Sequence, residues 1–325
     1  MKHAACVLLL ATAPGWALAQ TPPAASASGN ALDWLQRVYR ATETLSYSGT
    51  FVYQQGGRYE TSRIAHQADA TGGIEKLEVL DGSPREILRT RDEVRCYLPE
   101  SRTVKVDRRS GPGTFPAVLP AQVDSLKENY EITLGSTARI AGYECQAILL
   151  NPKDEWRYGY ALWADKKTAM LLRAQTFNRD GQLVEQFSFA RLDIGSVPRD
   201  RLRPPRVARG WHVEQSGATP VDLERDGWRI GEQLPGFRKV AEIRRTMGHA
   251  QPVGQVVYSD GMAAVSIFIE PLSSRNQATR TGLSGMGAVN VYTRKLGSFL
   301  VTVVGEAPAP SVQLVGDTVQ YHQPK

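Results

Sequence analysis

The sequence predicts a mainly β protein built from two domains, and three observations lead to this prediction. Segments of alternating apolar and polar residues recur between turn signals such as Gln55-Gly56-Gly57 and Asn178-Arg179-Asp180-Gly181. Few stretches between these segments have helical spacing, which favours an antiparallel sheet. The length of 325 residues also exceeds what one hydrophobic core usually holds.

Residues 1–19 are typical of a secretory signal peptide. A short basic start precedes the apolar run 4–13, and Ala17-Leu18-Ala19 has the small-x-small pattern that signal peptidase cuts. The apolar run is shorter than the roughly 20 residues that span a bilayer. We therefore expect cleavage and export rather than a membrane anchor. Cys6 lies inside the apolar run, which disfavours a lipid-modified N-terminal cysteine.

Residues 30–194 predict a first, β-rich domain. The preceding residues 20–29 are small, polar and proline-rich, as in a flexible leader. Asn30 can cap an amphipathic helix in which Leu32 and Leu35 begin a helical repeat. We also expect an irregular loop over 108–120, a short helix over 121–129, and strands over 47–54, 58–67, 74–80, 85–90, 94–98, 103–106, 130–134, 143–150, 156–164, 168–177 and 183–192.

Residues 195–210 are typical of a linker between domains, because they combine three prolines and five arginines with little hydrophobic content. This boundary leaves residues 211–325 for a smaller second domain. Its expected strands and final helix predict an α+β layout, with a polar, glycine-rich segment over 272–287. The expected strands cover 211–215, 228–237, 253–259, 263–270, 288–293 and 299–304, and the helix covers 309–320.

The composition and motifs point away from catalysis. The net charge of +6 is a mild basic excess that suits acidic peptides, phosphates or anionic lipid head groups, and the predicted export disfavours nucleic acid. No HExxH, CxxC or Walker motif occurs, and Gly282-Leu283-Ser284-Gly285 falls one residue short of a nucleophile elbow. We therefore expect no catalytic residue, no metal and no cofactor. A hydrolase that relies on carboxylates alone is the weakest alternative.

Two cysteines, Cys96 and Cys145, remain after the predicted cleavage. An oxidising compartment would permit a disulfide between them, and such a bridge typically contributes about 2–4 kcal/mol. Each cysteine lies in a strand-like segment, and the sequence does not say whether those strands are neighbours. Two separate buried thiols are the alternative.

Aromatic residues are concentrated in the expected strands of the first domain. One interpretation is ordinary packing of a core and a sheet face. The other is an apolar cavity inside a curved sheet, because an incompletely filled barrel offers a ligand site. The residues that would line this cavity are Phe51, Tyr53, Trp163, Met170, Leu172, Phe187 and Phe189.

Segments of both predicted domains resemble one known family. In the first domain they are Tyr158-Gly-Tyr-Ala-Leu-Trp-Ala-Asp165, Met170-Leu-Leu-Arg173 and Asp180-Gly-Gln-Leu-Val-Glu-Gln-Phe187. In the second they are Ser259-Asp-Gly-Met-Ala-Ala-Val-Ser-Ile-Phe-Ile-Glu270, Gly287-Ala-Val-Asn-Val-Tyr292 and Val301-Thr-Val-Val-Gly-Glu306. They look like the RseB/MucB family of periplasmic regulators of the extracytoplasmic stress sigma factor. The resemblance covers nearly the whole mature chain.

The resemblance implies a fold and a function. The first domain would be an unclosed antiparallel β-barrel capped by helices, similar to the carriers LolA and LolB, beside a smaller α+β domain. The family binds the periplasmic part of a membrane-spanning anti-sigma factor, RseA or MucA, and shields it from regulated proteolysis. Lipid or lipopolysaccharide would occupy the first domain and release the partner. The resemblance carries over no catalytic residue.

The partner surface is expected in a groove between the domains, next to the linker. Trp211, Trp228 and Arg229 are its candidate residues, together with the segment 272–287. The arginines of the linker and of 108–109 are either contacts for an acidic peptide or a phosphate, or solvated. A periplasmic lipid or lipoprotein carrier is the main alternative function, and strand edges of an open barrel leave a homo-oligomer open.

Overall fold

The structure is a computed structural model that describes residues 24–69, 73–108, 119–120, 122–207, 210–231, 234–247, 251–273, 276 and 278–323. The predicted signal peptide 1–19, the first residues of the predicted leader and most of the predicted loop 108–120 lie outside the described residues.

The described chain is mainly β, with few helices. The helices are α1 (Ala24–Thr44), α2 (Leu126–Asn129) and α3 (Ala309–Thr318), with 3₁₀ turns η1 (Val123–Ser125) and η2 (Arg199–Leu202). The strands of the N-terminal half are β1 (Tyr47–Gln55), β2 (Arg58–Gln67), β3 (Ile74–Val79), β4 (Arg85–Arg89), β5 (Glu93–Leu98), β6 (Thr103–Arg108), β7 (Tyr130–Ile140), β8 (Tyr143–Pro152), β9 (Gly159–Asp165), β10 (Leu171–Phe177) and β11 (Leu183–Ile194). Those of the C-terminal half are β12 (His212–Pro220), β13 (Trp228–Arg229), β14 (Arg238–Met247), β15 (Val253–Ser259), β16 (Ala264–Pro271), β17 (Gly282–Met286), β18 (Val289–Leu296), β19 (Phe299–Gly305) and β20 (Gln320–Tyr321).

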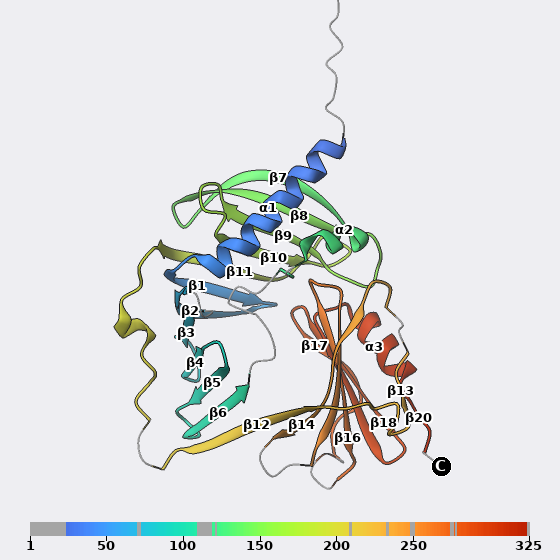
Figure 1. The fold of residues 1–325 in the computed structure, drawn as a ribbon. Coiled ribbons are helices and arrows are strands. Elements are labelled where there is room, and N and C mark those ends of the chain that lie inside the picture. Colours follow the sequence, from blue (N-terminus) through green and yellow to red (C-terminus); the bar gives the residue numbers. More distant parts are fainter. Residues whose placement is uncertain are drawn as a thin grey trace, which may run out of the picture.

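One large open sheet contains 18 of these strands, and β13 with β20 forms a separate two-stranded ribbon (Figure 1). The pairings give the spatial order β7-β8-β9-β10-β11-β1-β2-β3-β4-β5-β6-β12-β14-β15-β16-β19-β18-β17. Neighbours are antiparallel except β6 and β12, which are parallel, so the sheet is mixed. Within the described part of the chain no pairing joins β7 to β17, and the sheet therefore does not close into a barrel.

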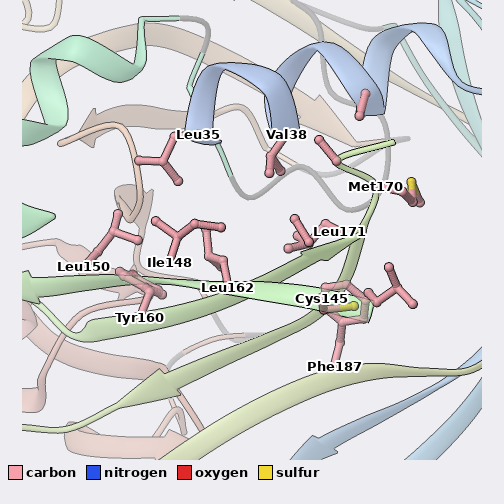
Figure 2. Packing of buried hydrophobic residues seen from close by; sticks show 14 of the residues in the cluster. Leu35, Val38, Cys145, Ile148, Leu150, Tyr160, Leu162, Met170, Leu171 and Phe187 are labelled. Atoms are coloured by element: carbon pink, nitrogen blue, oxygen red, sulfur yellow. The ribbon is translucent and has the colours of Figure 1, made fainter. Parts of the chain in front are cut away.

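The core of the N-terminal half lies between α1 and the strands β7 to β10. Ala31, Leu35 and Val38 recur at helical spacing on α1 and are buried. Figure 2 shows Leu35 and Val38 directed toward Ile148 and Leu162 of the sheet. Burying each such leucine contributes roughly 1.5–3 kcal/mol, so α1 is an integral part of this half.

A second core lies in the C-terminal half, where α3 packs on β18 and β19. Val312 and Val315 of α3 are buried in the same cluster as Val301, Val303 and Ile267 of the sheet. The apolar residues of β19 alternate with half-buried ones, as expected for a strand with one face against a helix. Each half thus has a core of its own.

Several expected boundaries are corrected by the structure. The leader was expected to reach residue 29, but α1 begins at Ala24, because the alanine-rich stretch that follows favours helix. The helix expected over 121–129 is a 3₁₀ turn followed by the single turn α2. The strand expected from Trp156 begins at Gly159, because Asp154 accepts a hydrogen bond from the backbone of Trp156 and holds a turn.

Four segments between and within the expected elements also differ. Among the described residues of the expected strand 228–237, only Trp228 and Arg229 are in a strand, β13. Strand β14 occupies a charged segment for which no strand was expected. The segment 272–287 ends in the regular strand β17. The expected linker 195–210 includes η2, and its Val197 and Leu202 are buried against Ala65 of β2, so this part of it packs on the sheet.

Candidate functional site

Two main connections join the halves of the described chain, and the first is a strand seam. Strand β12 pairs with β6 over His212 to Ser216 and with β14 over Ser216 to Pro220. One strand therefore passes from the sheet of the N-terminal half to that of the C-terminal half (Figure 1). Most residues of β12 are exposed, and Val213 keeps 54% of its surface accessible. The seam depends on backbone hydrogen bonds more than on apolar contacts.

The second connection is a buried junction formed by Tyr130, Arg157, Pro235, Phe237 and Asp260. Arg157 Nη1 lies 2.6 Å from Asp260 Oδ2, and both side chains are fully buried. Tyr130 donates a hydrogen bond of 3.0 Å to the same oxygen, and Arg157 Nη2 donates to the carbonyl of Pro235. The guanidinium also lies over the rings of Tyr130 and Phe237, at 5.6 and 5.2 Å.

The charges of the buried junction are matched group by group. Burial lowers the pKa of Arg157, but its hydrogen bond with Asp154 and the charge of Asp260 outweigh burial and raise that pKa. Burial, with Tyr160 and Asp260 nearby, raises the pKa of Tyr130, which therefore remains a donor. The other oxygen of Asp260 accepts from two backbone amides. Removing one partner would leave an uncompensated buried charge.

The β17–β18 hairpin adds a third point of contact, at the tip of β1 and β2 (Figure 1). The side chain of Gln55 donates a hydrogen bond of 2.8 Å to the carbonyl of Met286. The side chain of Asn290 donates one of 3.0 Å to Tyr158 Oη. A Cβ placed on Gly287, which has a φ of +61°, would lie 2.0 Å from Gln55 Cγ. The close approach of the two hairpins therefore requires glycine at this turn.

The seven predicted cavity residues come together, but as packed core. Phe51, Phe187 and Phe189 contact one another edge to face with ring centroids 5.9–6.1 Å apart. Met170 and Leu172 are fully buried in the same cluster. Tyr53 and Trp163 are half-buried and pack against it. This arrangement agrees with the interpretation as ordinary packing.

The predicted groove residues are brought together only in part. Trp228 is buried in the second core against Phe299 and Tyr321. It also lines, with exposed Arg229, a hollow of 670 Å³ beside β13 and β20. Trp211 packs elsewhere, on a small apolar cluster of β4, β5 and β6. The three residues therefore do not form one groove.

A larger hollow of 740 Å³ lies at the ends of β8, β9 and β10, next to the buried junction. Trp156 lines it and also packs against the second core. An exposed ion pair between Arg179 and Glu155, 2.9 Å long, lies at this hollow. None of the seven predicted cavity residues lines it, and its mixed charges do not favour an acyl chain.

The cysteines and metal ligands can be placed directly. Cys96 of β5 and Cys145 of β8 are both free thiols, and the disulfide considered above is not formed, because these strands are not neighbours in the sheet. Burial raises the pKa of the Cys145 thiol to about 11. The described residues contain no group of three or more His, Cys, Asp or Glu side chains able to hold a metal ion. No described helix is both long and apolar enough to cross a membrane.

The buried junction was not predicted from the sequence. Arg157 stands between two aromatic residues in an apparent strand, and Asp260 precedes a glycine in an apparent turn. Neither context marks a buried ion pair between segments 103 positions apart. The only available signal was a charged side chain within an aromatic run.

Comparison with known proteins gives a consistent result for both halves. The family model described as the MucB/RseB N-terminal domain matches residues 30–207, and that of the MucB/RseB C-terminal domain matches residues 222–320. The sigma factor AlgU regulatory protein MucB of Pseudomonas aeruginosa is 30% identical over 303 residues, which are 91% of this chain and 92% of that protein. The sigma-E factor regulatory protein RseB of Escherichia coli is 24% identical, with 88% and 89% covered.

Solved structures match over a similar extent. The crystal structure of MucB in complex with MucA(peri) has a TM-score of 0.67 and 28% identity, and covers 90% of this chain and 100% of that chain. The complex structure of Pseudomonas aeruginosa MucA/MucB has a TM-score of 0.68 and 27% identity, with 91% and 100% covered.

Proposed function

Because the chain belongs to the MucB/RseB family of sigma-factor regulatory proteins, we propose that it is a negative regulator of an extracytoplasmic stress sigma factor. It acts in the periplasm by binding the periplasmic region of a membrane-spanning anti-sigma factor. The bound anti-sigma factor is shielded from regulated proteolysis, and the sigma factor stays silent. The observation that carries this proposal is the match, at 27–28% identity over both halves, to MucB solved together with MucA.

The proposed division of labour follows the two cores. Residues 30–194 form an unclosed antiparallel barrel of the LolA/LolB type, residues 195–210 connect it, and residues 211–325 form a smaller α+β domain. Both domains contribute to the partner surface, and the buried junction fixes their arrangement. Support comes from apolar contacts across the halves, where Trp156 packs on the second core and Ala288 on the first. Among the predicted groove residues, exposed Arg229 and half-buried Trp211 remain accessible to a partner.

Release of the partner by lipid or lipopolysaccharide requires a second state of the first domain. A ligand shifts an equilibrium only by binding one state better than the other. The proposed lipid residues, Phe51, Phe187 and Phe189 among them, are packed together in the core that α1 covers. An acyl chain therefore enters when this packing opens. The opened state holds lipid, and the packed state holds the partner.

Titration calorimetry of the full mature chain with the periplasmic fragment of the cognate anti-sigma factor tests the proposal. We expect saturable binding that weakens when lipopolysaccharide is added. Absence of binding in both conditions would contradict the proposed function. If lipopolysaccharide leaves binding of the fragment unchanged, the proposed partner is supported and release by lipid is contradicted. Lipid binding without fragment binding would favour a lipid or lipoprotein carrier.

The lipid site needs a variant that keeps the core folded. Phe187 is only 6% exposed, so a charged residue there would unfold the domain. Phe187→Leu retains an apolar side chain, and we expect weaker lipopolysaccharide binding with a cooperative thermal transition. Ile267→Val, in the second core, serves as the control and should bind lipopolysaccharide like the wild type. Equal affinity of both variants would place the lipid away from Phe187.

A further inference from the structure

The two ends of the open sheet are protected to different degrees. Strand β7, at one end, carries Glu131 and Arg139 and has an irregular register between Leu134 and Thr137. Charges and bulges of this kind blunt an edge against pairing with another chain. Strand β17, at the other end, has neither charge nor proline, and its register with β18 is regular. Its edge is open to a further strand.

All five residues of β17 are exposed. Leu283 and Met286 keep 48% and 49% of their surface accessible, which is unusual for large apolar residues of a sheet. Within the described residues β18 is the one strand that pairs with β17. The strand therefore presents apolar side chains together with unpaired backbone groups.

The turn of the hairpin determines which backbone groups are unpaired. Gly287, with a φ of +61°, begins the two-residue turn between Met286 and Val289, as in a type II′ hairpin. The residues that close such a turn exchange both hydrogen bonds, and bonded and non-bonded pairs then alternate along the strands. The N–H and C=O groups of Leu283 and Gly285 are consequently directed away from β18.

Basic side chains lie at both ends of this edge. The guanidinium of Arg58 lies 3.5 Å from Met286 Sδ, and exposed Arg280 precedes β17 by two positions. Among the described residues neither arginine forms an ion pair. Glu60 and Glu185, two carboxylates of the neighbouring strands, are engaged by Arg85 and by Tyr53. Positive charge therefore flanks an apolar strand.

We propose that an extended segment of the anti-sigma partner adds to β17 as a further strand. The segment is about five to seven residues long, as the length of β17 requires. It carries an apolar residue on each face, to meet Leu283 on one side of the sheet and Met286 on the other, and carboxylates near both ends. This inference rests on the proposed function and adds the docking mode to it.

The charges argue against a second copy of this chain as the occupant. In an antiparallel pair of β17 strands, Arg58 of one copy lies against Arg280 of the other. In a parallel pair each arginine lies against its own equivalent. Like charges that face each other across strands are destabilising. An acidic segment relieves this repulsion and is the occupant that the edge fits.

Leu283→Pro tests the docking mode. Proline at this position removes an N–H that is directed to the free edge, so pairing with β18 is retained. Leu283→Ala is the matched control, because it removes the apolar side chain and keeps the N–H. In calorimetry with the periplasmic fragment of the cognate anti-sigma factor, we expect Leu283→Pro to bind about tenfold or more weakly. We expect the affinity of Leu283→Ala for the fragment to fall by about threefold or less.

Charge reversal gives a second, independent pair of variants. Arg58→Glu combined with Arg280→Glu should weaken binding of the fragment about tenfold, and the loss should shrink at high salt. Arg91→Glu, at another exposed arginine, is the control and should bind like the wild type. Equal binding by the double variant would contradict the charge complementarity.

The outcomes separate this inference from the proposed function. If Leu283→Pro binds the fragment as tightly as the wild type does, the docking mode is overturned and the proposed regulatory function is unaffected. Absence of binding by the wild type overturns both. If Leu283→Pro does not fold, amide exchange of the wild type decides, because the amides of Leu283 and Gly285 must be protected in the complex. Loss of a self-associated species in free Leu283→Pro would identify a second copy as the occupant.

Discussion

The two main connections between the halves differ in chemistry. The strand seam joins β6 and β12 through backbone hydrogen bonds on a largely exposed strand. The buried junction joins Arg157 and Asp260 through an ion pair from which water is excluded. A seam of exposed backbone can bend or fray at small cost, because water replaces its hydrogen bonds. A desolvated ion pair is either complete or strongly unfavourable, and it therefore defines one arrangement of the halves.

The largest effect is expected at the buried junction. Asp260→Ala removes the buried partner of Arg157, which keeps only the partly exposed Asp154 as a charged partner, and it also removes the acceptor of Tyr130. We expect a loss of about 3–5 kcal/mol in the free energy of unfolding, measured by urea denaturation. Arg238→Ala is the control, because its ion pair with Glu128 also crosses the halves but is mostly exposed. That variant should lose less than about 1 kcal/mol.

The next largest effect on the free energy of unfolding is expected at acid pH, and it concerns the N-terminal half. His66 is buried beside Tyr47, and burial lowers its pKa to about 4, although the charge of Asp69 opposes this. Below pH 6.5 the unfolded chain binds a proton at His66 that the folded chain does not bind until about pH 4. The stability therefore falls as pH decreases through this window, by roughly 1.4 kcal/mol per pH unit. His66→Phe should remove this slope.

Acid also tests whether the junction couples the halves. With the junction intact, a single denaturation transition should weaken as pH falls. In Asp260→Ala the acid effect should be confined to the transition of the N-terminal half, reported by fluorescence of Trp34 or Trp163. A single transition in that variant at all pH values would show that the seam alone couples the halves.

A smaller effect is expected at the rim of the buried junction. Ser311 of α3 is fully buried. Its hydroxyl donates a hydrogen bond of 3.0 Å to the carbonyl of Trp156, which belongs to the other half. Ser311→Ala leaves that carbonyl without this donor, so we expect a loss of about 1–2 kcal/mol by thermal denaturation. Thr318→Ala serves as the comparison, because the hydroxyl of Thr318 donates its hydrogen bond within α3. This variant should lose less stability than Ser311→Ala.

The smallest effect is expected at the seam. Arg245 of β14 lies 3.4 Å from Asp107 of β6, and both side chains are partly exposed. Arg245→Ala should therefore change the free energy of unfolding by less than about 1 kcal/mol. A loss as large as that of Asp260→Ala would show that the seam is the stronger connection and would reverse the comparison.

The sequence predicted the strands better than their connections. The boundaries of β2 and β15 follow from alternating apolar residues and turn signals, and both match the expected ranges. Strand β14 was missed because its arginines and lysine mask the alternation, and it is a strand because β12 and β15 pair on its two sides. Strand β17 was interpreted as loop because its glycines and serine have low strand propensity.

The functional contacts were predictable to a smaller degree. The aromatic cluster around Phe187 was identified, since large apolar residues at alternate strand positions must share a face. The buried junction was not, because the partners of Arg157 come from elements distant in sequence. Trp228 was expected in a groove and lies in the core, because Phe299 and Tyr321 surround it. Pairing of this kind depends on the tertiary arrangement and not on local pattern.

The central claim is that the buried junction holds the halves in the arrangement that binds the anti-sigma partner. Titration of the periplasmic fragment of the cognate anti-sigma factor into wild type, Asp260→Asn and Arg238→Ala tests it most directly. We predict saturable binding by the wild type and by Arg238→Ala, and about tenfold or weaker binding by folded Asp260→Asn. Equal affinity of all three proteins, or no binding by the wild type, would contradict the account.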